Sequence, residues 1–216
     1  MELQYHEIIT RDALGEFFAE AALREIIAAN FRQDSPANLI GKPYLHFDND
    51  KIAESLAYID GQLARLVGAA GDDAEIRRVQ WDAFGRLCHT AQDFYAHSNY
   101  VDLWLAENGG TENVAPAEID GLDEKFLAHP ALRTGSFHLL RDIVYYIPGI
   151  RTLARKIHIP QFSHEMMHLD DPTRGEKFAF AMAAAVQRTR FEYRRTVDAL
   201  SARGGSAAVA RFLGKQ

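Results

Sequence analysis

The sequence predicts an all-α fold, a multi-helix bundle formed by a single domain over residues 1–216. Apolar residues recur at helical spacing in several long segments. No segment alternates apolar and polar residues, as a strand with one buried face would. The length suits one domain with a substantial core, and no linker-like stretch divides the chain.

The first two predicted helices lie in the N-terminal third of the chain. One covers residues 10–31, begins just after His6, and ends before the Pro-containing stretch at residues 34–36. The other covers residues 52–66, where apolar residues repeat every three or four positions, and Asp50 is its expected N-cap. A polar loop is expected to connect the two helices.

The remaining predicted helices follow in order. The third and longest starts near residue 71 and runs to about Trp104. Residues 108–121, rich in Gly, Asn, Thr and Pro, predict a surface loop, and short helical pieces are expected from there to Pro160. The last long helix is expected over residues 173–203.

Composition excludes several classes of function. A net charge of −6 counts against duplex nucleic-acid binding, which normally needs a clustered excess of Lys and Arg. No apolar run approaches the roughly 20 residues of a membrane helix, and the N-terminal residues lack the features of a signal peptide. We therefore expect no transmembrane segment and, by default, a cytoplasmic location. The sequence does not indicate an oligomeric state.

The cysteine count restricts the chemistry of any metal site. The sequence contains one cysteine, Cys88, which excludes an internal disulfide framework and a Cys-rich zinc site. Histidines and carboxylates would have to hold any metal ion.

The strongest candidate site is the segment at residues 89–97. His89, Asp93 and His97 are spaced by four residues, so on a helix each is rotated by about 40° and raised by about 6 Å from the one before. His89 and Asp93 could hold one ion, His97 suits a second, and Asp93 could bridge them. Zinc accepts both nitrogen and oxygen ligands. The alternative, a solvated Asp93 between partly buried histidines, fits poorly with the apolar neighbours at 94–96.

Further candidate ligands gather near the ends of predicted elements. They are His6, His46, Asp48, His164, His168 and Asp170. His46 and Asp48 would point to the same side of an extended loop, which suits joint ligation. Each of these residues alone is more often a surface residue, and their clustering favours the metal hypothesis.

Residues 164–168 match the H-E-x-x-H pattern of zinc peptidases. In that pattern two histidines on one helical face bind zinc and the glutamate activates water. Here Pro160 and Pro172 leave room for only two or three helical turns, and no strand is predicted that could align a peptide. A peptidase would hold one zinc between His164 and His168 and none at His89.

Residues 85–100 carry a more specific pattern. They resemble the LHxxQDFYAHSN signature of proteins related to the Het-C family, which is similar in turn to the zinc-dependent phospholipase C and P1 nuclease superfamily. The resemblance implies a helical fold of that type that holds two or three Zn²⁺ ions. It implies that His89, Asp93 and Asp48 serve one ion. His97 and His164 would serve another, and His6 would join Asp93 at the third.

The resemblance also implies an activity, the hydrolysis of phosphate esters by a phospholipase C-like phosphodiesterase. A metal-bound hydroxide would attack phosphorus while zinc stabilises the leaving oxygen. Asp48 is the residue expected to take part in catalysis. Phospholipids are the first substrate hypothesis and nucleotides the second. The alternative is a non-catalytic zinc-binding scaffold or interaction protein of the Het-C type.

The chain departs from the family pattern in three places. Phospholipases of this kind use the mature N-terminal residue as a ligand, whereas here Met1 precedes His6 by five residues. They also have a histidine between the loop aspartate and the helical pair. None lies between Asp48 and His89, so His46 is the candidate to replace it. Either His168 or Asp170 would complete the second metal site.

Overall fold

A computed structural model describes residues 1–39, 41–136 and 168–215 of the chain. Within these residues every regular element is a helix, and Ser98 and Thr134 form an isolated antiparallel β-bridge. The predicted all-α multi-helix bundle is therefore confirmed. None of the helices described here has the length and apolar character needed to cross a membrane.

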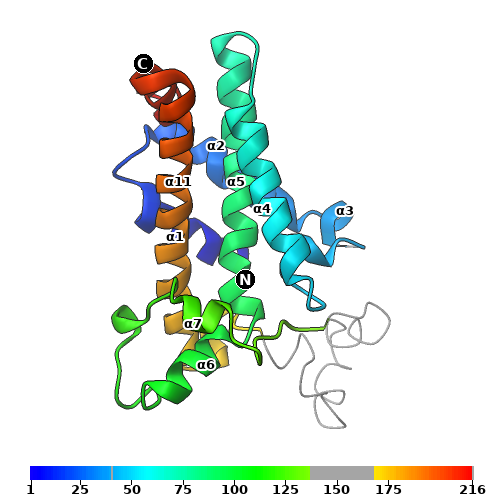
Figure 1. Cartoon of the computed structure of the whole chain (residues 1–216), viewed down its shortest axis with the longest axis vertical. Coiled ribbons are helices and arrows are strands. Elements are labelled where there is room, and N and C mark those ends of the chain that lie inside the picture. The colour runs from blue at the N-terminus through cyan, green and yellow to red at the C-terminus, as the bar shows by residue number, and fades with distance from the viewer. Residues whose placement is uncertain (40, 137–167, 216) are drawn as a thin grey trace.

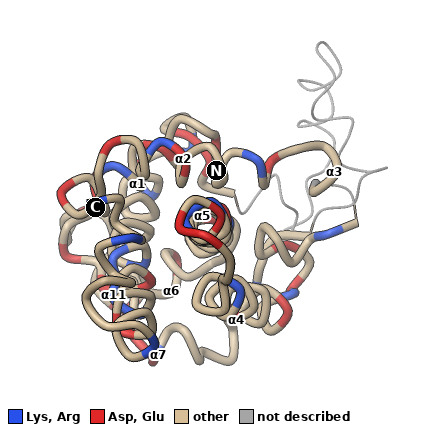
Figure 2. The backbone as a smooth tube through the Cα atoms, turned by 90° about the horizontal axis from the view of Figure 1, so that it is seen from above, with Lys and Arg blue, Asp and Glu red and all other residues tan. Residues whose placement is uncertain are grey.

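The centre of the bundle is α5 (Asp73–His97), which packs against three other long helices (Figures 1 and 2). These are α2 (Glu20–Phe31), α4 (Ile52–Val67) and α11 (Lys177–Leu213). The other α-helices are α1 (Leu3–Leu14), α3 (Pro36–Leu39), α6 (Tyr100–Glu107) and α7 (Glu124–Leu127). Single 3₁₀ turns are η1 (Arg32–Asp34), η2 (Pro43–Leu45), η3 (Pro116–Glu118) and η5 (Pro172–Arg174).

The predicted helix over residues 10–31 is wrong, because the structure has two helices there. α1 ends at Leu14, and α2 begins only after Ala19, whose backbone is extended at φ −64° and ψ 143°. The Ala19 amide donates to the Leu213 carbonyl at 2.9 Å, so a contact with the end of α11 fixes the break. His6 consequently lies inside α1 rather than before the first helix.

The predicted continuation of the third helix to Trp104 is also wrong. α5 ends at His97 because the next residues pair with a distant segment instead of continuing the helix. The Gly135 amide donates to the His97 carbonyl at 2.8 Å, and the Asn99 amide donates to the Arg133 carbonyl at 3.1 Å. A new helix, α6, then starts at Tyr100.

The expected N-cap of the second helix and the bounds of the last helix also differ from the prediction. Asp50 does not cap α4, because its carboxylate accepts a hydrogen bond from the Thr134 amide at 2.7 Å. Lys51 takes the N-cap position. The last helix starts at Lys177 and continues beyond residue 203 to Leu213, through non-helical backbone at residues 204 and 205.

The two halves of α5 differ in burial. Its first turns are mostly exposed, whereas almost every residue from Ala83 to His97 is buried. Gly85 lies against α2, and a Cβ atom added there would be 2.2 Å from the Ile26 carbonyl oxygen. Backbone therefore meets backbone where α2 crosses α5, and this contact brings the end of α2 close to the candidate ligands.

Candidate metal centre

The buried half of α5 presents His89 and Asp93 toward the interior of the bundle, and His97 ends the helix on the same side. Two further histidines join them, His6 from α1 and His46 from the loop after η2. All five residues are buried, and Asp93 is only 1% exposed. The helix face that the spacing of His89, Asp93 and His97 predicts is thus the centre of a cluster. α1, the loop after η2 and α5 all contribute residues to it.

The two oxygens of Asp93 contact different groups. Oδ2 lies 3.0 Å from His46 Nδ1 and 3.0 Å from His89 Nε2, and these two nitrogens are 3.1 Å apart. Oδ1 lies 3.2 Å from His6 Nε2 and 2.9 Å from the Met1 amine. Ligand atoms around a tetrahedral zinc lie about 3.3 Å apart, given metal–ligand bonds of about 2.0–2.1 Å. The triangle of His46, His89 and Asp93 is close to that size.

Two buried nitrogen atoms in this cluster lack a hydrogen-bond partner among the described residues. They are His6 Nε2 and His46 Nε2. Buried polar atoms are nearly always hydrogen-bonded, so such orphans call for another partner. His6 Nε2, 3.2 Å from Asp93 Oδ1, fits a metal ligand, whereas His46 meets Asp93 through Nδ1, so its unpartnered Nε2 lies outside the ligand triangle. The buried His and Asp groups could hold metal ions, with one group at His46, His89 and Asp93 and another at His6, Asp34 and His89.

Two buried amide side chains orient the histidines. His6 Nδ1 contacts Gln92 Oε1 at 2.7 Å, His89 Nδ1 contacts Asn30 Oδ1 at 3.1 Å, and Asn30 Nδ2 donates to Gln92 Oε1 at 3.0 Å. Because an amide oxygen only accepts, both Nδ1 atoms must carry hydrogen, which leaves each Nε2 lone pair free for a metal. The Gln92 amide nitrogen donates in turn to Thr10 and Thr189, at 3.1 Å each.

Asp34 is a member of the cluster that the sequence analysis missed. It ends η1, and its Oδ1 lies 3.5 Å from His89 Nε2 and 3.7 Å from His46 Nδ1. Its side chain is 27% exposed, which makes it the most accessible carboxylate of the group. The sequence signal was order along the chain. An aspartate at 34 followed by a histidine at 46 precedes His89, and this is the order of ligands that the resemblance of residues 85–100 implies.

Asp48 lies on the other side of the cluster. It was expected to share an ion with His89 and Asp93, but its Oδ1 is 3.4 Å from His97 Nδ1. The same His97 nitrogen contacts the backbone oxygen of His46 at 2.7 Å. The loop from His46 to Asp48 therefore contributes to both sides of Asp93.

The His97 side also gathers residues from the segment before η5. His97 Nε2 is 3.2 Å from Asp170 Oδ1, and Asp170 Oδ2 is 3.5 Å from His168 Nε2. The Arg174 guanidinium contacts His168 Nε2 as well. Of the two residues left open by the sequence, Asp170 contacts His97 directly and His168 lies behind it. His164, with most of the H-E-x-x-H segment, lies outside the described residues.

The charges of the cluster are strongly coupled. Burial opposes ionisation of Asp93, but the Met1 ammonium and His89 outweigh it and hold the Asp93 pKa well below its usual range. Burial lowers the pKa of His89 to about 4, despite the opposing effect of Asp93. A neutral His89 beside an ionised Asp93 is the protonation state that metal ligands need.

The opposite end of the cluster is positively charged. Burial disfavours the Met1 ammonium, but Asp170 and Asp93 raise its pKa to about 11. Burial and the Met1 ammonium also disfavour a charged His97, yet Asp48 and Asp93 raise the His97 pKa well above its ordinary value. Positive charge is therefore concentrated next to Asp93 Oδ1, and the neutral imidazole of His89 faces Oδ2.

The chain is similar to proteins of known sequence over its N-terminal half. The profile of the VWA7 N-terminal domain matches residues 5–116. Over 84 residues the chain is 38% identical to human von Willebrand factor A domain-containing protein 7 and 36% identical to the rat and mouse proteins. The aligned segment covers 38% of this chain and only 9% of each relative. No solved structure matches the chain significantly.

The matched region contains most of the cluster. It includes His6, Asp34, His46 and the whole of α5, whereas Met1 and Asp170 lie outside it. Because the family profile spans more than half of the sequence, the chain belongs to the VWA7 N-terminal domain family, and its buried His and Asp cluster is a candidate metal site within that domain.

Proposed function

We propose that the chain is a zinc-dependent hydrolase of phosphate esters, with a phospholipase C-like phosphodiesterase activity. One observation carries the proposal, namely that His46, His89 and Asp93 offer three ligand atoms 3.0–3.1 Å apart with the Asp34 carboxylate just beyond them. Catalytic zinc sites typically have three protein ligands and one open position, whereas structural sites are closed by four. The resemblance of residues 85–100 to the phospholipase C and P1 nuclease superfamily points to the same chemistry.

The residues divide into groups around Asp93. His46, His89 and Asp93 Oδ2 would hold one zinc ion, and His6 with Asp93 Oδ1 supplies donors for another. His97, with Asp170 and Asp48 beside it, offers donors on the far side. When bound, zinc would lower the pKa of a water ligand toward about 7 and neutralise charge on the phosphate oxygens.

Asp34 is the residue we propose as general base. It lies 3.5–3.7 Å from two ligand nitrogens and is partly exposed, so a substrate could approach it. It does not belong to the set of His46, His89 and Asp93, although it could also join His6 and His89 at a second ion. A carboxylate at that position can accept the proton of an attacking water molecule. Asp34 would thus take the catalytic part that the sequence analysis gave to Asp48. Asp48 stays a candidate ligand beside His97.

The alternative is a non-catalytic zinc scaffold, and the same carboxylate favours it under one condition. If Asp34 moves onto the metal, two nitrogens and two oxygens complete a tetrahedral site with no position for substrate. The two functions therefore differ in what Asp34 does. A base is dispensable for metal binding, whereas a fourth ligand is not.

The test compares Asp34→Asn with the wild type after loading with zinc. Zinc per chain and zinc affinity are measured together with hydrolysis of a chromogenic phosphodiester, a phosphatidylcholine vesicle and a dinucleotide. Asp198→Asn, an exposed carboxylate on α11, is the matched control. For a base, we expect about 100-fold slower hydrolysis with unchanged zinc content. The vesicle and dinucleotide arms identify the substrate class.

Two outcomes would reject the hydrolase. Hydrolysis that is absent from the zinc-loaded wild type, with zinc affinity lost in Asp34→Asn, would establish the scaffold. An anomalous-scattering map with one zinc between His164 and His168 and none at His89 would establish the peptidase instead.

A further inference from the structure

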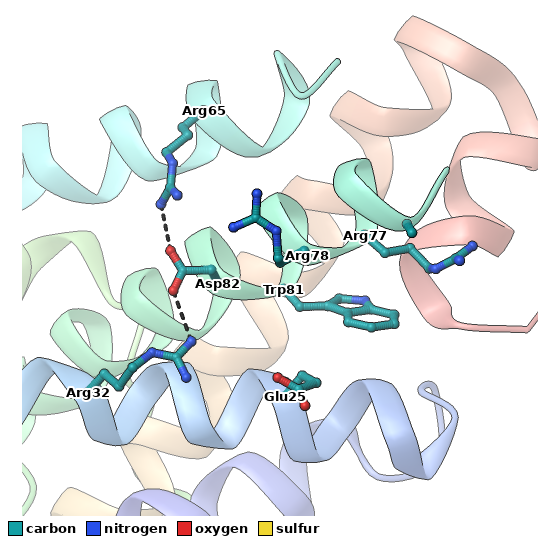
Figure 3. Close-up of a pocket in the computed structure, with 8 residues that line it drawn as sticks. Glu25, Arg32, Arg65, Arg77, Arg78, Trp81 and Asp82 are labelled. Carbon is teal, nitrogen blue, oxygen red and sulfur yellow. Dashed lines mark hydrogen bonds and ion pairs between the residues drawn. The ribbon is translucent and has the colours of Figure 1, made fainter. Parts of the chain in front are cut away.

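A second polar site lies near the start of α5. It is bordered by α2, by η1 and by the end of α4. It is a cavity of about 660 Å³. Its charged and aromatic lining consists of four arginines, two carboxylates and a tryptophan, so positive charge is in surplus (Figure 3): Arg32, Arg65, Arg77, Arg78, Glu25, Asp82 and Trp81. The helical rise from residue 81 to residue 93 separates this cavity from the metal centre by about 18 Å.

Asp82 has its charge neutralised by arginines. Its Oδ1 accepts from Arg32 at 3.0 Å and its Oδ2 from Arg65 at 2.8 Å (Figure 3). Arg86 of the next turn adds a bond to Oδ2 at 3.1 Å. Partial burial would raise the Asp82 pKa, but the hydrogen bonds from Arg65 and Arg32 lower it below its ordinary value. Asp82 is therefore ionised and engaged, and it does not repel an anion as a lone carboxylate would.

Arg77 and Arg78 differ from the bridged arginines. No ion pair or hydrogen bond of either guanidinium is recorded with the described residues, although both line the cavity. Both are at least partly exposed to solvent. A guanidinium presents several donors in a rigid plane that matches the oxygens of a phosphate or carboxylate. The two groups are thus available to an anionic ligand.

Trp81 gives the cavity a fixed aromatic wall. Its indole nitrogen donates to the Phe212 carbonyl at 2.7 Å, so contact with the end of α11 holds the ring in place. The ring is half-buried, lines the cavity, and lies in Figure 3 near Arg77 and Arg78. A planar ligand can stack on such a ring with little loss of protein side-chain entropy.

We propose that this cavity binds a small phosphate-bearing molecule with a planar ring, the chemistry of a nucleotide. Arg77 and Arg78 bind the phosphate, and the ring lies against Trp81. The volume falls within the range of about 300–1,000 Å³ that is usual for small-molecule sites. The whole chain carries a net charge of −6, so a local surplus of arginine is needed to attract such an anion. The proposal does not depend on the hydrolase activity.

The experiment is calorimetric titration of the zinc-loaded full chain with adenosine 5′-monophosphate. Ribose 5-phosphate and adenosine, titrated separately, measure the contributions of the phosphate and the ring. Adenosine 5′-monophosphate is expected to bind at least about tenfold more tightly than either fragment, because charge-assisted bonds and stacking add. The Arg77→Gln/Arg78→Gln variant is expected to lose about tenfold or more of that affinity.

Two further variants locate the binding. Arg24→Gln/Arg203→Gln removes the same charge from exposed positions outside the cavity and should change affinity by no more than about twofold. Asp93→Asn removes a proposed ligand of the metal centre and lies outside the cavity, so it should leave the affinity unchanged in samples whose circular dichroism matches that of the wild type. The proposal is overturned by any of three results: no binding, equal binding by the Arg77→Gln/Arg78→Gln variant, or loss of binding in Asp93→Asn. The last would place the nucleotide at the metal centre.

Discussion

The two halves of α5 carry charged residues in different surroundings, partly exposed to solvent in the first half and buried in the second. In the first half, Arg77 and Arg78 are at least partly exposed, and the partly buried Asp82 is bridged to arginines of neighbouring elements. In the second half, Asp93 and its histidines are buried. Exposed ion pairs contribute little to stability, so arginines there are free to serve a ligand. A buried carboxylate persists only where cations and donors surround it, so each partner matters.

The largest effect is expected when the negative charge of Asp93 is removed. Asp93→Asn replaces the carboxylate, whose two oxygens serve the two sides of the cluster, by an amide, which is a weaker metal ligand. Loss of even an outer partner of a ligand costs about 10–100-fold in metal affinity, so we expect a loss of about 100-fold or more. Zinc affinity is measured by competition with a chelator dye, with Asp198→Asn as control. Unchanged zinc content would mean that Asp93 is not a ligand.

The next test concerns the amides that orient the histidines. Gln92→Leu removes the acceptor for His6 Nδ1 and for Asn30, so the histidine tautomers are no longer fixed. Zinc affinity should fall by about 10–100-fold. Imidazole ¹⁵N spectra should show mixed tautomers in place of one. Thr189→Val is the matched control, because it removes a contact at the far end of Gln92. Equal losses in both variants would indicate a packing effect.

Acid should affect the buried half first. The pKa of His89 is lowered from 6.5 to about 4, so between these values the unfolded chain binds a proton that the folded chain does not. The stability of the metal-free protein should therefore decrease as pH falls from 6.5 to 4. His97, whose pKa is raised, is protonated in the folded state throughout this range, and its opposing effect fades as the unfolded histidine also becomes protonated below 6.5. Urea unfolding across this range measures the effect.

Two variants test whether His89 causes this decrease in stability with falling pH. His89→Gln should flatten the decrease between pH 6.5 and 4, and His129→Gln, outside the cluster, should leave it in place. A slope that persists in His89→Gln would have to come from another group of the cluster.

The smallest effect is expected in the exposed half. Asp82→Asn weakens three ion pairs whose partners are partly solvated, and it should reduce the free energy of unfolding by about 1 kcal/mol or less. Zinc affinity should not change. Urea unfolding and zinc titration of the same sample test both statements. A loss as large as that of a buried pair would contradict the contrast between the two halves.

Helical spacing was enough to predict what lies within one helix. His89, Asp93 and His97 share a buried face, because positions four apart on a helix always do. Long-range contacts were not predictable in this way. Asn30 and Asp34 join the cluster only because α2 packs on α5, and α5 stops at His97 because residues 133–135 pair with the chain there. The sequence therefore indicated the metal-binding helix but not the residues that surround it.

Gly85 lies outside the metal centre but affects its geometry, because it sets how closely α2 approaches α5. One helical turn beyond the contact between Gly85 and Ile26, His89 meets Asn30 at 3.1 Å. Because residue 85 has no side chain, α2 and α5 can approach closely enough for the Asn30 amide to reach the His89 imidazole. Even one methyl group would wedge the two helices apart. A residue that touches no ligand therefore limits how accurately the ligands can be aligned.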